Sequence, residues 1–188
     1  MSFIDAVQSG FKNYFNFKGR ASRSEFWYWV LFTILLSLVL GTIEGVIWPA
    51  PISTGDWMQD LDSFASQPTP FTSLASVLLL IPNLSVTARR FHDAGFSAKW
   101  LFLQLGPLAY AIFAGIGVVT VVANAGSEEL SYEAIMSLIF LILPIVAMAM
   151  AVLVIYLVMA LRPSRSFYDG NKYVEPTPLS AGDEGTTA

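Results

Sequence analysis

The sequence predicts an all-α integral membrane protein in which four transmembrane helices form a bundle. Three observations support this prediction. The chain of 188 residues is 55% hydrophobic and 13% charged, with a mean hydropathy of +0.60, outside the range of a soluble domain of this size. Four apolar stretches are long enough to cross about 30 Å of hydrocarbon. The basic residues fall only in segments on one side of these stretches, so both termini are predicted to be cytoplasmic.

The first 25 residues are predicted to lie at the cytoplasmic surface of the membrane. Between residues 2 and 17, apolar side chains recur at helical spacing with Asp5, Gln8 and Lys12 between them, and Ser2 is placed to cap the first turn. This pattern predicts an amphipathic helix in the membrane interface. The alternative is a cytoplasmic helix that packs on the transmembrane bundle.

The transmembrane domain is predicted to cover residues 26–161, with spans at about 26–48, 71–88, 100–123 and 134–161. Pro82 and Asn83 interrupt the second span, and we expect a kink there, packed inside the bundle, with neighbouring helices or hydroxyl groups satisfying the freed carbonyl. Glu44 lies near the far end of the first span. Its carboxylate is expected to reach the outer interface rather than to serve as a buried functional acid.

The distribution of charge determines the predicted topology. The ten basic residues lie before the first span, between the second and third spans, and after the fourth: Lys12, Lys18, Arg20, Arg23, Arg89, Arg90, Lys99, Arg162, Arg165 and Lys172. The loops at 49–70 and 124–133 are acidic, contain no basic residue, and are predicted to face outward. Residues 162–188 form a predicted cytoplasmic tail, of which about the last dozen residues are expected to be disordered.

Two stretches at the predicted inner ends of the first two spans resemble a known family. They are residues 16–27 (NFKGRASRSEFW) and 89–95 (RRFHDAG), and the similarity continues to Gly170–Tyr173. They resemble the signature stretches of domain of unknown function 805, the YhaH-like bacterial inner-membrane proteins. Phe91 and Val174 depart from the family pattern, which more often has Leu and Gly at these places. The resemblance implies a multi-pass protein of the bacterial plasma (inner) membrane and implies no reaction.

These stretches define a candidate functional cluster. Because the first two spans are joined outside, their inner ends are expected to lie side by side, with Gly95 as the C-cap of the second helix. Spacing of three and four residues places Arg89, His92 and Asp93 on one helix face. The candidate residues are Gly19, Arg20, Arg23, Glu25, Trp27, Arg89, Arg90, His92, Asp93 and Gly95.

Three interpretations of the cluster remain open at this stage. In the first, arginines pair with Glu25 and Asp93 and fix the helix ends. In the second, arginine forks bind an anionic ligand such as a lipid head group. In the third, His92 is a general base oriented by Asp93, although adjacent side chains on a helix point about 100° apart. The chain has one His and no Cys, and we predict no metal, cofactor or catalytic residue.

The sequence therefore favours a non-enzymatic membrane module that binds anionic lipids or a membrane-protein partner through this cluster. The alternative is a small transporter or channel subunit, as a homo-oligomer, in which Pro82, Pro107 and Pro144 break three helices. A lipid-modifying enzyme that uses His92 and Asp93 is the third hypothesis. No nucleic-acid partner is expected.

Overall fold

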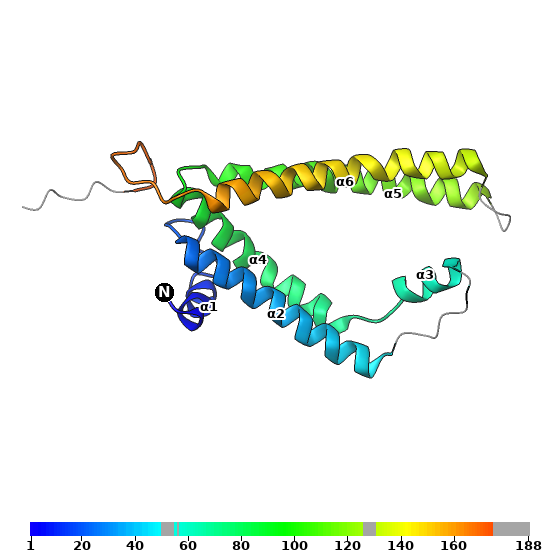
Figure 1. Cartoon of the computed structure of the whole chain (residues 1–188), viewed down its shortest axis with the longest axis horizontal. Coiled ribbons are helices and arrows are strands. Elements are labelled where there is room, and N and C mark those ends of the chain that lie inside the picture. The colour runs from blue at the N-terminus through cyan, green and yellow to red at the C-terminus, as the bar shows by residue number, and fades with distance from the viewer. Residues whose placement is uncertain (50–54, 56, 126–130, 175–188) are drawn as a thin grey trace, which may run out of the picture. The chain divides into compact units, whose positions relative to one another are not determined.

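The computed structural model describes residues 1–49, 55, 57–125 and 131–174, and all regular structure in these residues is helical (Figure 1). The helices are α1 (Phe3–Lys12), α2 (Arg23–Ile47), α3 (Trp57–Ala65), α4 (Pro70–Asp93), the 3₁₀ helix η1 (Ala98–Gln104), α5 (Leu105–Ala125) and α6 (Tyr132–Leu161). Four helical segments are long and apolar enough to cross a membrane: Arg23–Ile47, Pro70–Asp93, Ala98–Asn124 and Tyr132–Leu161. The predicted number of membrane-capable helices is confirmed. The chain forms two compact units, Met1–Asp93 and Ala94–Ala188.

The first unit is an antiparallel pair of long helices, α2 and α4, with α1 packed against both near one end (Figure 1). Its apolar core is centred on Trp29, which is 1% exposed and packs with Leu79 and Val86 of α4. The Trp29 indole N–H also donates a hydrogen bond of 2.6 Å to Asn83. The amide of Asn83 thus has a hydrogen-bond partner within the helix pair.

Helix α1 begins with a capping box. The Ser2 hydroxyl accepts a hydrogen bond from the backbone N–H of Asp5, and the Asp5 carboxylate accepts one from the backbone N–H of Ser2, which lowers the pKa of Asp5. Gly10 is buried, and a Cβ at this position would overlap the indole of Trp29. Phe11 meets the same indole edge-on, with ring centroids 5.3 Å apart. Helix α1 therefore packs on the long helices, while its location in a membrane interface stays a prediction.

Pro82 lies within α4 and is buried, and the helix continues through it. Proline has no N–H, so it cannot donate to the carbonyl of Leu78 one turn earlier. The hydroxyl of Tyr14, in the segment that joins α1 to α2, donates a hydrogen bond to this carbonyl. The expectation that a hydroxyl group satisfies the freed carbonyl is confirmed.

Glu44 is buried near the end of α2. The side chain is 4% exposed and turns toward the start of α4, where its carboxylate accepts hydrogen bonds from the backbone N–H groups of Phe71 at 2.5 Å and Thr72 at 2.9 Å and from the Thr72 hydroxyl. The first turn of a helix has free N–H groups and a positive dipole end, and both favour a carboxylate. The side chain therefore caps α4 instead of extending into solvent, while its place at the outer interface stays a prediction.

The predicted loop at 49–70 contains helix α3, which the sequence analysis missed. The nine helical residues contain no Pro or Gly, whereas Gly55 precedes them and Pro68 follows them, so the stretch between the breakers is free to form a helix. Asp56, Glu128, Glu129 and the predicted disordered end of the tail lie outside the described residues.

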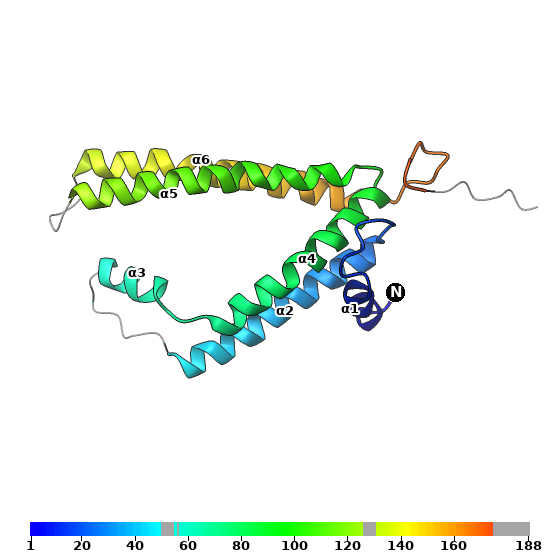
Figure 2. The same cartoon turned by 180° about the vertical axis from the view of Figure 1, so that it is seen from behind.

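In the second unit α5 and α6 lie side by side in both views (Figures 1 and 2). They approach closely at Gly117, where a Cβ would come within 3.0 Å of Leu141. The predicted third span begins with 3₁₀ geometry, and the hydroxyl of Tyr156 on α6 bonds to the carbonyls of Trp100 at 2.9 Å and Leu101 at 3.1 Å. These bonds satisfy carbonyls at the point where the chain passes from η1 into α5.

The proline residues do not break the helices as the transporter alternative requires. Helix α6 runs through Pro144 without interruption, as α4 does through Pro82. Pro107 lies in the first turn of α5, where a missing N–H costs little because it has no intrahelical partner.

The bond between Tyr14 and Leu78 gives a test of the packing around Pro82. Tyr14→Phe leaves the Leu78 carbonyl without its partner and is expected to lower the free energy of unfolding by about 1 kcal/mol. In Pro82→Ala the restored N–H of residue 82 bonds to this carbonyl, so Tyr14→Phe is expected to cost much less in that background. Unfolding titrations of the full chain in mixed micelles with increasing sodium dodecyl sulfate measure the four proteins of this double-mutant cycle.

Tyr132→Phe is the control, because Tyr132 is 76% exposed. Equal costs of Tyr14→Phe in the two backgrounds would contradict the pairing.

Candidate functional site

The candidate site lies at the end of the first unit where α4 finishes. Five consecutive residues of α4, Arg89 to Asp93, are buried, although four of them are polar or charged. Helix α2 begins beside them, with the Ser22 hydroxyl accepting a hydrogen bond of 3.2 Å from the backbone N–H of Glu25. The segment between α1 and α2 is joined to α4 by a hydrogen bond of 3.1 Å from the N–H of Ala21 to the carbonyl of Arg89.

The described residues of this site form three ion pairs, two of which connect these elements and one of which lies within α4. Arg89 Nη1 lies 2.8 Å from Glu25 Oε1, and both side chains are nearly fully buried, at 4% and 8% exposed. Arg20 bonds to Asp93 Oδ1 through Nε at 2.7 Å and Nη2 at 2.6 Å. Arg90, which is fully buried, pairs with the other oxygen of Asp93. Each buried arginine therefore has a carboxylate beside it, as buried charges require.

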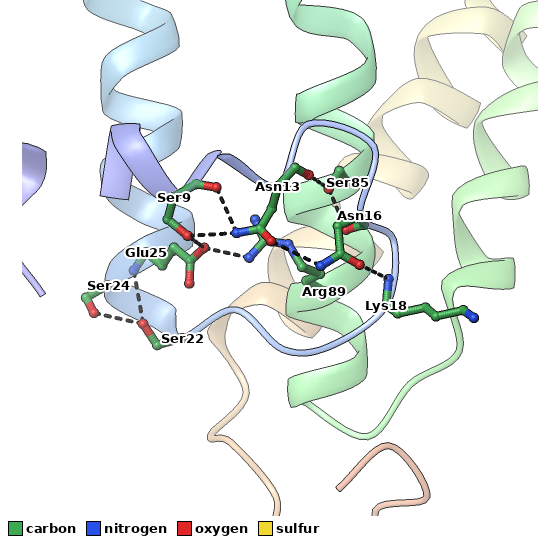
Figure 3. Close-up of polar contacts among 9 residues, drawn as sticks. All are labelled: Ser9, Asn13, Asn16, Lys18, Ser22, Ser24, Glu25, Ser85 and Arg89. Carbon is green, nitrogen blue, oxygen red and sulfur yellow. Dashed lines mark hydrogen bonds and ion pairs between the residues drawn. The ribbon is translucent and has the colours of Figure 1, made fainter. Parts of the chain in front are cut away.

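A polar network extends from these pairs to α1 (Figure 3). The Ser9 hydroxyl donates to Glu25 Oε1 at 2.8 Å, so this oxygen accepts from both Ser9 and Arg89. The Asn13 amide donates to the Ser9 carbonyl at 3.0 Å. The Ser85 hydroxyl of α4 lies 2.7 Å from the carbonyl oxygens of Asn13 and Asn16. Helix α1 and the turn that follows it are thus attached to the same polar cluster as α2 and α4.

The predicted proximity of the two helix ends is confirmed, but the pairing within it differs from the expectation. Asp93 pairs with Arg20 and Arg90, whereas Arg89, which we expected on the face of Asp93, pairs with Glu25. His92 is 9% exposed and its imidazole hydrogen-bonds to the backbone of Gly19, where a positive φ of 88° places the chain in a conformation that suits glycine.

Three other predicted residues lie at the margin of this cluster or outside it. Arg23 is exposed in the first turn of α2, close enough for its charge to act on Arg90. Trp27 is 37% exposed and packs edge-on against Phe26. Gly95 follows α4 with φ +84°, as expected of a C-cap glycine, and it belongs to the second unit.

The sequence analysis missed the uncharged members of the network: Ser9, Asn13, Asn16 and Ser85. A signal was present for Ser85, which lies four residues before Arg89 and hence on the same face of α4. Ser9 lies one residue before buried Gly10 on α1, and nothing in the helical pattern distinguishes it from a solvated serine.

The second unit has a separate polar turn near Gly95. A Cβ at Gly95 would lie 3.1 Å from Arg165 Cδ, and the Arg162 guanidinium lies 5.2 Å from the centre of the Phe96 ring, within the range of a cation–π contact. Asn171 is 2% exposed and donates to the Arg165 carbonyl at 3.1 Å. The predicted tail therefore folds back in an ordered loop as far as Val174, the last residue described there.

Four helical segments of membrane-spanning length, with three ion pairs at the end of one helical pair, define a multi-pass helical membrane protein. The chain belongs to the DUF805 family of proteins of unknown function, whose family model matches residues 14–173. This range contains every member of the predicted cluster.

Similar proteins include the inner membrane protein YhaH of Escherichia coli (strain K12), which is 32% identical over 96 residues, 51% of this chain and 69% of YhaH. The uncharacterized protein YiiR of the same organism is 32% identical over 101 residues, 54% of this chain and 56% of YiiR. The inner membrane protein YhaI is 26% identical over 97 residues, 51% of this chain and 67% of YhaI. No solved structure matches this chain.

The ion pairs make a direct prediction for stability. Asp93→Asn removes the carboxylate that Arg90 and Arg20 share and leaves the fully buried Arg90 without a counter-charge. We expect the free energy of unfolding to fall by about 3 kcal/mol or more, measured by titration with sodium dodecyl sulfate in mixed micelles. Glu133→Gln, an exposed carboxylate in the first turn of α6, is the matched control and is expected to cost less than about 0.5 kcal/mol.

Proposed function

We propose that this chain is a non-enzymatic inner-membrane module that binds anionic lipid head groups through the cluster at the end of α4. The observation that supports the proposal is the number of cations in this part of the described chain: Arg20, Arg89 and Arg90 pair with two carboxylates, Glu25 and Asp93, and the charge of a fourth arginine, Arg23, acts on Arg90. Guanidinium groups match phosphate geometry. Each basic residue near an anionic membrane surface contributes about 1 kcal/mol of attraction.

The exposed residues of the cluster are the ones that would meet the lipid. Arg20 has a side chain 36% exposed although it pairs with Asp93, and Arg23 is exposed in the first turn of α2. These two arginines can therefore accept a head group while the buried pairs hold the helices together.

Helix α1 and the turn that follows it add an apolar edge to the same end of the unit. While Ala6 and Gly10 face the long helices, Ile4, Phe11 and Phe15 are 66%, 46% and 76% exposed. Apolar side chains beside basic ones are typical of helices that lie at head-group depth. In the proposed topology this end faces the cytoplasm, with both termini inside.

The polar residues that a transporter or an enzyme would use have other hydrogen-bond partners, which favours the module. A transport pathway would use polar side chains such as Asn83, but this amide oxygen accepts a hydrogen bond from the buried Trp29 indole. An enzyme would use His92 with Asp93, but the imidazole bonds to the Gly19 backbone and both Asp93 oxygens accept from arginines.

The proposed topology is tested by thiol labelling, which the absence of cysteine in this chain makes clean. Single substitutions Ser24→Cys near the cluster and Ser66→Cys in the segment between α3 and α4 are expected to differ: a membrane-impermeant maleimide added to intact spheroplasts labels residue 66 only. Lysed membranes, in which both sites react, are the control. Labelling of residue 24 in intact spheroplasts would overturn the orientation.

Lipid binding is tested by native mass spectrometry of the purified full chain. The double variant Arg20→Gln/Arg23→Gln removes the two exposed charges and is expected to lower retention of phosphatidylglycerol at least tenfold relative to phosphatidylethanolamine, as two lost contacts of about 1 kcal/mol imply.

The matched control is Lys99→Gln/Lys172→Gln, which removes two exposed basic residues of the second unit and is expected to retain lipid as the wild type does. Equal retention by the two double variants would overturn the lipid proposal, and retention of another protein in place of lipid would favour the protein-partner alternative.

A further inference from the structure

Arg89 has an edge of its guanidinium group that nothing in the described part of the chain satisfies. Its Nη1 bonds to Glu25, but Nε and Nη2 are buried, each with less than 1 Å² of accessible surface, and have no hydrogen-bond partner among the described residues. Nε–H and Nη2–H point in nearly the same direction and form the two-pronged edge by which arginine binds a carboxylate or a phosphate.

Arg20, in the same cluster, shows this edge occupied. Its Nε and Nη2 both bond to Asp93 Oδ1, at 2.7 Å and 2.6 Å. Arg20 is partly exposed, so solvent is available to it, whereas Arg89 is 3% exposed. The more deeply buried of the two arginines is therefore the one whose edge lacks an acceptor, and an unsatisfied buried donor of a charged group is costly.

We propose that the Nε/Nη2 edge of Arg89 is a binding site for one phosphate group, held by two parallel hydrogen bonds. If the phosphate belongs to a lipid head group, this inference rests on the proposed function. Free inorganic phosphate has the same chemistry and is the other source. The charge balance of the described cluster supports an anion over a neutral group, because its four arginines face the two carboxylates Glu25 and Asp93. An oxyanion reduces this excess, which a water molecule does not.

The ligand reaches this edge through movement of the segment that joins α1 to α2. The turn at Asn13 to Asn16 lies beside Arg89 (Figure 3), attached to α4 through Ser85. Since both nitrogens are closed to solvent, the covering chain must shift for a phosphate to enter. Gly19 in this segment has a positive φ, and glycine has the widest choice of backbone conformations for such a movement.

The test compares Arg89→Lys with the wild-type full chain in an uncharged detergent. Lysine keeps the positive charge and a donor for Glu25 but lacks the two-pronged edge.

The midpoint of thermal unfolding is measured against inorganic phosphate at constant ionic strength, balanced with chloride, and separately against phosphatidylglycerol in mixed micelles. We expect phosphate, lipid or both to raise the wild-type midpoint, and Arg89→Lys to need at least a tenfold higher concentration for the same shift. Arg162→Lys, at an exposed arginine of the second unit that is outside the cluster, is the control and is expected to respond like the wild type.

The two arms identify the source: a response to inorganic phosphate indicates a free ion, and a response to phosphatidylglycerol alone indicates a head group. No response in either arm, or the same response in Arg89→Lys as in the wild type, would overturn the site and indicate that water fills it.

A wild-type measurement covers the case in which Arg89→Lys does not fold. With ¹⁵Nε-labelled arginine, the six arginines of the chain give at most six Nε–H signals, and one buried, slowly exchanging signal is expected to move on addition of phosphate; if none moves, the proposal is wrong. Failure of this site leaves the Arg20/Arg23 lipid test unaffected, since that test depends on the exposed arginines.

Discussion

Two adjacent buried guanidinium groups constrain the first helical unit. Arg89 and Arg90 follow each other on α4 and are 3% and 0% exposed, and a buried charge is costly unless a counter-charge lies beside it. Neighbouring side chains on a helix point about 100° apart, so one carboxylate does not serve both. Arg90 finds Asp93 one turn further along its own helix, and Arg89 finds Glu25 on α2. This second pair determines which turn of α2 lies against the end of α4, and through Ser9 it also attaches α1.

Helix α2 supplies a second carboxylate to the opposite end of α4. Glu25 and Glu44 are about 19 residues apart, or about 28 Å at 1.5 Å per residue, close to the roughly 30 Å thickness of a hydrocarbon core. Glu25 meets a guanidinium at the C-terminal end of α4, and Glu44 meets the free N–H groups at its N-terminal end. Together the two contacts fix the register of the antiparallel pair. Between these contacts the helices are held together by apolar packing around Trp29.

Hydropathy and charge were sufficient to predict the four long helices and the meeting of residues 20–25 with residues 89–93, because helices of a hairpin necessarily share an end. They were not sufficient to predict the partners. Helical periodicity places Arg89, His92 and Asp93 on one face of α4 but does not say how that face is rotated toward α2, which depends on the packing of Trp29 and on the close approach at Gly10. The role of Tyr14 could not be predicted for a similar reason. Pro82 shows from the sequence that the carbonyl of Leu78 lacks its helical donor, but the hydroxyl that bonds to this carbonyl lies far away along the chain.

The charge excess connects this packing to the proposed role at a membrane surface. Asp93 is shared by two arginines and the bonded oxygen of Glu25 by an arginine and a serine, so the cluster is internally bonded and still positive. Such a group is expensive at the bilayer centre, whereas beside anionic head groups each positive charge is attractive. The exposed Ile4 of α1 and Phe15 of the turn after it favour the same depth, since apolar side chains near basic ones suit the boundary between head groups and acyl chains. The arginines that fold this end of the helix pair are thus also the residues on which the proposed lipid contact depends.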